Sequence, residues 1–334
     1  MSPGPYAHST SAANQGSRRL AGLDLGTNTF LCLIADVDKA SGGLKVVRDE
    51  VRIVRLGQGV DASKTLHPEA LARAEACFKE FESFILEAKA EKVLAVATSA
   101  TRDSSNGHLL IELGRKHGIP IEVISGEREA ELTFQGSLEP HWQGLTAVID
   151  VGGGSTEVII GDKSGIVLRF SADVGSVRLT EKFVTSHPIA KAEVQEMEYL
   201  VCRRLHEGLQ KSLAQFGDQT QSSAVWANIR TKLKNVVAVA GTPTTLAAVV
   251  LGKPFEAESI HGFSLSMKTL EEMMADLASK TIEQRQAMGG MEPKRADVIV
   301  AGAICLKEAG RLLGAEALEV SIRGLRYGVV KGMV

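Results

Sequence analysis

The feature that most constrains this chain is a repeat of one short segment. AGLDLGTNTFLCLIAD, residues 21–36, aligns without a gap with AVIDVGGGSTEVIIGD, residues 147–162. Each copy is an apolar run that reaches an aspartate, Asp24 or Asp150, passes through a glycine-rich turn and continues into a second apolar run. Short apolar runs bounded by glycine are typical of buried β-strands. The repeat therefore predicts two similar strand–turn–strand units.

The similarity continues beyond these units in matching order. A third strand candidate follows each unit, then a helix-rich region, then an apolar strand that runs into small hydroxyl residues. The paired segments are GLKVVR and GIVLRF, PEALARAEACFKEFESFILEAK and AEVQEMEYLVCRRLHEGLQKSLAQF, and VLAVATSATR and VVAVAGTPTT. Matching elements in matching order indicate an internal duplication.

The duplication predicts an α/β fold with two related domains. Each domain would contain a mixed sheet that begins with antiparallel strands and adds parallel strands through helical crossovers. Two such domains leave a cleft between them, and clefts of this kind usually hold the ligand. We expect the two glycine-rich turns to face each other across that cleft.

Composition narrows the setting. The chain has 334 residues, of which 44% are hydrophobic, and a formal net charge of −2, which suits a folded two-domain protein and offers no general case for nucleic-acid binding. Its four cysteines are scattered without a CxxC pair, which suggests a reduced, cytoplasmic setting. Residues 1–17 lack the apolar core of a signal peptide and are predicted to be a disordered tail. No run is long and apolar enough to span a membrane.

The glycine-rich turns have two interpretations. Glycine could serve only to allow a tight hairpin, or the turn could present backbone N–H groups to an anion. A hairpin role explains each turn singly. It does not explain why both turns have an aspartate two positions before the first glycine and a hydroxyl residue, Thr29 or Ser155, three positions after it. The repeat therefore favours anion binding.

The duplicated arrangement resembles the acetate kinase, sugar kinase, Hsp70 and actin superfamily, whose domains have a ribonuclease H-like fold. Within it, the chain most resembles the exopolyphosphatase and guanosine pentaphosphate phosphatase family, Ppx/GppA. The resemblance covers about residues 20–330, and the motifs that carry it are DLGTNTF, ATSATRD, ISGEREAEL, DVGGGSTEV, VAGTPTTLA, IHGFSLS and KRADVIVAGAICL.

The resemblance implies a general base in the segment ISGEREAEL. The family's base is the glutamate directly before the alanine, which is Glu129 here. The family commonly has an acidic residue just before it, where this chain has Arg128, so Glu127 is a weaker candidate. The alternative is that these acids only favour the dipole of a helix capped near Ser125.

The resemblance also implies a magnesium site, with a monovalent cation as a second candidate. Asp150 and Glu157 flank the second turn and match family positions associated with the metal, and Asp24 corresponds to Asp150 in the first copy. A hairpin could direct Asp150 and Glu157 toward the same phosphate. The alternative is that the two aspartates only hydrogen-bond the turn backbone.

Phosphate binding would depend on the two turns and one arginine. Arg102 matches a family arginine beside the reacting phosphate, and a guanidinium can bind phosphate oxygens bidentately. An arginine after a strand is otherwise usually a solvated surface residue. The turn residues expected to bind phosphate through backbone N–H groups or hydroxyls are Gly26, Thr27, Asn28, Gly152, Gly153, Gly154 and Ser155.

Other positions have less defined roles. Gly241 and Thr242 are candidate channel or nucleoside contacts, and His261 matches a family histidine without an assigned role. Ile322 and Tyr327 stand where the family commonly has acids. Longer members carry an additional HD-like helical region after this core, so we expect less processive attack on very long polyphosphate here.

We therefore expect a phosphohydrolase that uses a glutamate-activated water and magnesium. Its substrate would be inorganic polyphosphate, the alarmone pppGpp, or both. The alternatives are a catalytically weak alarmone or polyphosphate sensor and a kinase of the same superfamily. We predict a first domain over residues 18–139, a second over residues 140–323, a C-terminal helix over residues 324–334 that returns to the first domain, and a homodimer.

Overall fold

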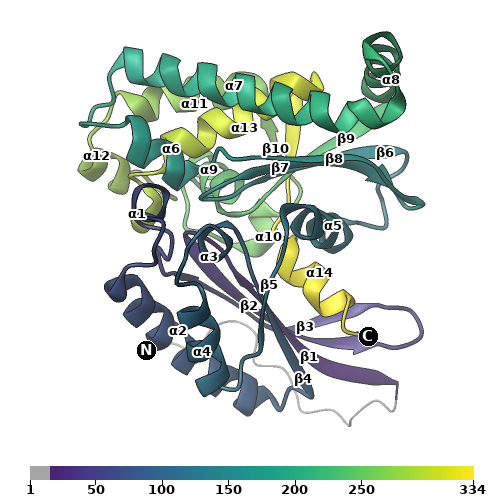
Figure 1. Cartoon of the computed structure of the whole chain (residues 1–334), viewed down its shortest axis with the longest axis vertical. Coiled ribbons are helices and arrows are strands. Elements are labelled where there is room, and N and C mark those ends of the chain that lie inside the picture. Colours follow the sequence, from purple (N-terminus) through teal and green to yellow (C-terminus); the bar gives the residue numbers. More distant parts are fainter. Residues whose placement is uncertain (1–15) are drawn as a thin grey trace.

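The computed structural model describes residues 16–334, which form two mixed β-sheets with helices between and outside them (Figure 1). The first sheet has the order β3-β2-β1-β4-β5. Most of the predicted N-terminal tail lies outside the described residues, whereas Ser17, which was predicted to belong to it, begins β1. The strands are β1 (Ser17–Leu25), β2 (Thr29–Asp38), β3 (Leu44–Ile53), β4 (Lys92–Ala97) and β5 (Ile121–Val123).

The second sheet repeats this pattern and extends it. Its order is β10-β11-β9-β6-β7-β8, with β6, β7 and β8 antiparallel and β9 parallel to β6, as β4 is parallel to β1. The predicted α/β class and internal duplication are therefore confirmed. The strands are β6 (Leu145–Val151), β7 (Thr156–Asp162), β8 (Gly165–Ala172), β9 (Leu233–Val239), β10 (Phe263–Ser266) and β11 (Ala317–Val320).

Helices cover the outer faces of both sheets. On the first sheet they are α2 (Pro68–Ala88) and α4 (His108–Lys116), whose buried apolar side chains pack against β1 and β2. On the second sheet they include α7 (Lys191–Leu213), α9 (Gly241–Leu251), α11 (Met267–Ala278) and α13 (Ile299–Leu313). Within residues 16–334, no helix is both long enough and apolar enough to cross a membrane. The remaining helices are α1 (Val60–Ser63), α3 (Ser99–Arg102), α6 (Ser176–Phe183), α8 (Gln219–Lys232), α10 (Ala257–Ile260) and α12 (Ile282–Gln286), with 3-10 turns η1 (Ala214–Phe216) and η2 (Pro293–Arg295).

Two helices form a layer between the sheets, α5 (Gly126–Ser137) and α14 (Leu325–Lys331) (Figure 1). α14 packs on β1, β2 and α5, while α5 also packs on β7 and β8. The two helices cross at glycines: a Cβ on Gly136 would lie 2.0 Å from the Gly324 carbonyl oxygen, and one on Gly328 would lie 1.9 Å from that of Leu132. Because α5 contacts both halves, it ties them together at the cleft. The domain limits themselves stay a prediction.

Candidate active site

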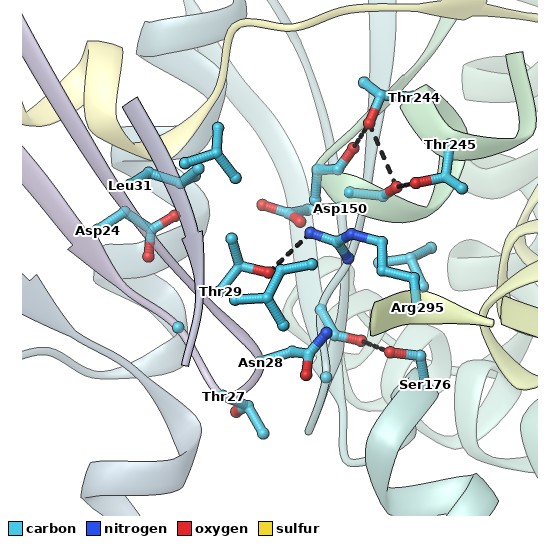
Figure 2. A pocket seen from close by; sticks show the side chains of 18 of the residues that line it. Asp24, Thr27, Asn28, Thr29, Leu31, Asp150, Ser176, Thr244, Thr245 and Arg295 are labelled. Carbon is cyan, nitrogen blue, oxygen red and sulfur yellow. Dashed lines mark hydrogen bonds between the residues drawn. The ribbon is translucent and has the colours of Figure 1, made fainter. Parts of the chain in front are cut away.

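A cleft of about 390 Å³ lies where both glycine-rich turns meet. Gly26, Thr27 and Asn28 line it from the β1–β2 turn, and Gly152 and Gly153 line it from the β6–β7 turn. Figure 2 shows the first turn and Asp150 on opposite sides of this space, with Arg295 reaching in between them. The structure thus brings the two copies of the repeated segment to one site.

Strand register places the acidic side chains at this site. Asp24 and Asp150 are the half-buried residues near the ends of β1 and β6, where their neighbours on either side are buried and apolar. Asp150 lies directly opposite Glu157 in the β6–β7 ladder, as the expected hairpin requires. Glu157 is 1% exposed and accepts a 2.7 Å hydrogen bond from Ser171 Oγ. Asp24 and Asp150 line the cleft, whereas Glu157 does not.

These carboxyl groups have raised pKa values. Burial, and then the charge of Asp150, raises the pKa of Asp24 to about 7 and that of Glu157 to about 7. Burial raises the pKa of Asp150 to about 6, against a hydrogen bond from Thr133. The crowded carboxylates repel one another, so a bound cation would stabilise their charged forms. The described residues hold no ready-made cluster of three metal ligands, so a metal here would also need phosphate or water oxygens.

Glu129 lies in the first turn of α5, which begins as the sequence predicted. Ser125 caps this helix by accepting a 3.2 Å hydrogen bond from the Arg128 N–H. Glu129 is buried and lines the cleft, whereas Glu127 is exposed and does not. Burial, followed by the charges of Glu157 and Asp150, raises the pKa of Glu129 well above its usual value, and Arg102 opposes this shift. Of the two candidate bases in this segment, Glu129 is therefore the one that lines the cleft.

Arg102 lies beside the site, in contact with Glu129. Its Nη1 donates a 3.0 Å hydrogen bond to the Ile124 carbonyl and lies 3.4 Å from Glu129 Oε2. Arg102 is not among the residues that line the cleft. In this arrangement its guanidinium favours the charged form of Glu129, which a general base needs.

The N–H groups of the two turns divide into two sets. Those of Gly26 and Gly152 donate 3.0 Å hydrogen bonds to the carbonyls of Thr29 and Ser155, which closes each hairpin. This corrects the expectation that Gly26 and Gly152 would offer their N–H groups to phosphate. The other N–H groups of the two turns have no hydrogen-bond acceptor within residues 16–334; they belong to Thr27, Asn28, Gly153, Gly154 and Ser155.

The carbonyl groups of the second turn explain where its free N–H groups point. The N–H of Ser176 donates to the Gly152 carbonyl at 3.0 Å, and that of Val177 donates to the Gly153 carbonyl at 2.9 Å, both from the start of α6. In a trans peptide the C=O and N–H point in opposite directions. The N–H groups of Gly153 and Gly154 therefore point away from α6, as anion binding requires.

The glycines of the second turn are also required by contact with the first turn. A Cβ on Gly153 would lie 2.9 Å from Thr27 Cβ, and a Cβ on Gly154 would lie 2.5 Å from Ser99 Oγ. Thr27 Oγ1 and Ser99 Oγ are themselves 2.8 Å apart. The side chains packed against Gly153 and Gly154 are therefore Thr27 of the opposite turn and Ser99 of α3.

Sequence reasoning missed Arg295. Its Nη2 donates a 2.7 Å hydrogen bond to Thr29 Oγ1 across the cleft (Figure 2). Burial lowers its pKa to about 10. A Cβ on Gly241 would lie 2.1 Å from the guanidinium, so a larger residue there would displace the Arg295 side chain. The residue lies in the family-like segment KRADVIVAGAICL, but an arginine in a loop is too common to single out without its neighbours. Close by, Asn28 Nδ2 is buried without a partner.

The segment after β9 meets the cleft differently from what was expected. Gly241, Thr244 and Thr245 line it, but Thr242 does not. Thr242 is buried against α13, where a Cβ on Gly302 would lie 2.5 Å from its hydroxyl. The proposed contact at Thr242 is therefore replaced by Thr244 and Thr245, because the first turn of α9 directs Thr242 into the core.

The structure also places the three further residues that the sequence singled out. His261 Nε2 lies 3.3 Å from Glu139, away from the cleft lining. Tyr327 donates a hydrogen bond of 3.1 Å to Asp49, which also forms a bidentate pair with Arg326. Ile322 lines the cleft as an apolar group where relatives commonly have an acid.

The fold and the site define an α/β protein with two mixed sheets and an acidic cleft where two glycine-rich turns meet. Residues 33–334 match the model of the Ppx/GppA phosphatase family, and the chain belongs to that family. It is 37% identical over 326 residues to exopolyphosphatase 2 of Mycobacterium tuberculosis, covering 93% of this chain and 97% of that one.

Solved structures agree with this assignment. An exopolyphosphatase from Cytophaga hutchinsonii superposes with a TM-score of 0.79 at 29% identity, over 95% of this chain and 97% of that one. The Ppx/GppA family member of Aquifex aeolicus superposes with a TM-score of 0.71 at 28% identity, over the same shares of the two chains. The chain thus has the architecture of its family over nearly its whole length.

Proposed function

We propose that this protein is a phosphohydrolase that releases terminal orthophosphate from inorganic polyphosphate, converts pppGpp to ppGpp, or does both. The observation that carries the proposal is Glu129, a buried carboxylate in the cleft, held beside Arg102 and facing the two turns. Family membership supports a hydrolase of this type, and polyphosphate is the substrate class that the relatives' names suggest.

In the proposed mechanism Glu129 takes a proton from the attacking water. Its Oε2 lies 3.4 Å from Arg102 Nη1, and this guanidinium opposes the rise in pKa that burial and the neighbouring carboxylates cause. The free N–H groups of Thr27, Asn28 and Gly153 would bind the oxygens of the terminal phosphoryl group. Groups that already point at the developing charge need no reorganisation during the reaction.

Arg295 and Asn28 would complete the anion site. The Arg295 guanidinium crosses the cleft to Thr29, and the unpartnered amide of Asn28 is buried beside it. Both are donors in a cleft that is also lined by four acidic residues, Asp24, Glu129, Asp150 and Glu292. A phosphate chain in this cleft would therefore meet both hydrogen-bond donors and acids.

The acids suit a metal ion. The family depends on metal ions in general, and the oxygen ligands and mutual repulsion of Asp24, Asp150 and Glu157 fit Mg²⁺, which commonly takes one or two carboxylates and completes its shell with water and phosphate oxygens. When bound, Mg²⁺ would neutralise charge on the phosphate oxygens. Asp150 and its ladder partner Glu157 are the residues that would hold it.

The test is phosphate release by the purified protein with Mg²⁺ and without any phosphoryl acceptor. Initial rates on pppGpp and on polyphosphate of defined lengths would separate the two substrates. Release without an acceptor is expected, and it excludes a kinase. Binding of either compound without release would instead indicate a sensor and overturn the proposal. The expected homodimer is checked by light scattering on the same sample.

A further inference from the structure

Arg178 connects the second phosphate turn to the opposite half of the molecule. It lies in α6, and its Nε donates a 2.8 Å hydrogen bond to the Gly154 carbonyl. Its other nitrogens pair with Asp61 in α1 and, at 2.8 Å, with Asp103, which directly follows α3. In Figure 1, α1 and α3 lie below α6, where the two halves of the molecule meet. One guanidinium therefore bridges the turn and two acids of the first sheet's half.

The contact with Gly154 completes the orientation of the turn. Backbone N–H groups at the start of α6 already bind the carbonyls of Gly152 and Gly153. The Arg178 side chain binds the next carbonyl in the series, so the N–H of Ser155 also points away from α6. Three successive donors thus face the same direction. The third of them depends on a side chain, and that side chain depends on acids across the interface.

The ion pairs of Arg178 are well placed to affect the site. Its side chain is 18% exposed, so its charge interactions are less screened than those of a surface pair. Asp103 Oδ1 also lies 3.9 Å from Arg102 Nε, next to the arginine that contacts Glu129. Close by, Glu181 accepts a 2.9 Å hydrogen bond from the Gly59 N–H, a second contact between α6 and the other half.

We propose that Arg178 is a positioning residue that couples closure of the cleft to the geometry of the second phosphate turn. When the two halves are together, Asp61 and Asp103 hold the guanidinium where it orients the Gly154–Ser155 peptide. When they separate, the guanidinium loses both anchors and the turn loses its third carbonyl contact. Phosphate would then be bound by a fully ordered turn only in the closed form.

The test compares three changes to this bridge. Arg178→Lys keeps the charge and loses the planar fork, and the pair Asp61→Asn with Asp103→Asn leaves every group that touches the turn unchanged. Arg55→Gln breaks a different ion pair between the halves, Arg55 to Asp297, which does not touch the turn. Arg204→Lys, in an exposed pair with Glu207 on α7, is the surface control.

Hydrogen exchange of the Ser176 and Val177 amides reports on the turn without requiring turnover. We expect exchange at least tenfold faster in Arg178→Lys and in the double asparagine variant, and unchanged exchange in Arg55→Gln and Arg204→Lys. Unchanged exchange in Arg178→Lys, or a change there without one in the double variant, would overturn the coupling. Equal acceleration in Arg55→Gln would reduce Arg178 to one interface contact among several and also overturn it.

Kinetics give the second readout, and this part rests on the proposed function. Arg178→Lys should lower kcat and raise KM for polyphosphate, with a fall in kcat/KM of at least tenfold, whereas Arg55→Gln should mainly raise KM. A normal kcat in Arg178→Lys would overturn the inference. A wild-type protein that releases no phosphate would overturn the proposed function alone, because the exchange experiment still decides the role of Arg178.

Discussion

Glu129→Gln tests the central step of the proposed reaction. The substitution keeps the shape of the side chain and removes its ability to accept the water proton. Glu129 lies in the cleft with its Oε2 3.4 Å from Arg102 Nη1, and glutamine can retain an oxygen at that position. The change leaves the proposed substrate contacts of the two turns untouched. The variant should therefore lose catalysis and keep binding.

The expected magnitude follows from the role of the residue. Removing a general base typically costs a factor of 10² to 10⁴ in rate, or roughly 3–5 kcal/mol in activation free energy. The stability of the folded protein, in contrast to its activity, should not fall. Glu157 and Asp150 both raise the pKa of Glu129 through their charges, so replacing its charge with a neutral amide removes repulsion. We expect kcat to fall at least 100-fold and Tm to stay the same or rise.

The assay is steady-state phosphate release from polyphosphate of defined length, with binding measured by calorimetry and Tm by differential scanning. Glu127→Gln is the matched control. Glu127 lies in the same helical turn as Glu129, but it is exposed and does not line the cleft. This variant should keep near-normal kcat. A Glu129→Gln variant with normal turnover, or a Glu127→Gln variant that loses it, would refute the assignment of the base.

Three other changes test the site. Gly154→Ala should reduce kcat/KM about tenfold or more, because its Cβ would lie 2.5 Å from Ser99 Oγ. Adding Ser99→Ala should restore part of the loss. Steady-state kinetics that show no such rescue would contradict the contact between Gly154 and Ser99. Arg295→Ala should raise KM about tenfold or more with a smaller change in kcat, since a charged hydrogen bond is worth roughly 1.5–3 kcal/mol; an unchanged KM would remove Arg295 from the anion site. In the presence of a chelator, Tm should be higher at pH 5 than at pH 8, because the pKa values of Asp24 and Glu157 in the folded protein, about 7, exceed their unfolded values. The stability that comes from their protonation is therefore complete at low pH and is lost as the pH rises through 7. Mg²⁺ should raise Tm most at pH 8, and a larger Mg²⁺ effect at pH 5 in a thermal scan would count against the metal site.

The fold was readable from the sequence because its signals are local and repeated. Apolar strand runs, helix periodicity and the turn glycines recur in the same order in both halves, and the structure confirms the two mixed sheets that they predict. The register of Asp150 opposite Glu157 also follows from the length of the turn, since a short hairpin allows few pairings. The cap at Ser125 follows from its residue type and position.

Contacts between segments that are distant in the chain depend on the tertiary structure. Arg295 meets Thr29 across the cleft, and Arg178 meets Asp61 and Asp103 across the interface, although nothing local distinguishes these arginines from solvated ones. The glycines of the second turn allow close contact with Thr27 of the first turn and Ser99 of α3. Sequence determines which groups can bind phosphate, because propensity and residue chemistry are local properties. Which of them face the cleft depends on packing between the two halves, and packing is settled only when both are folded together.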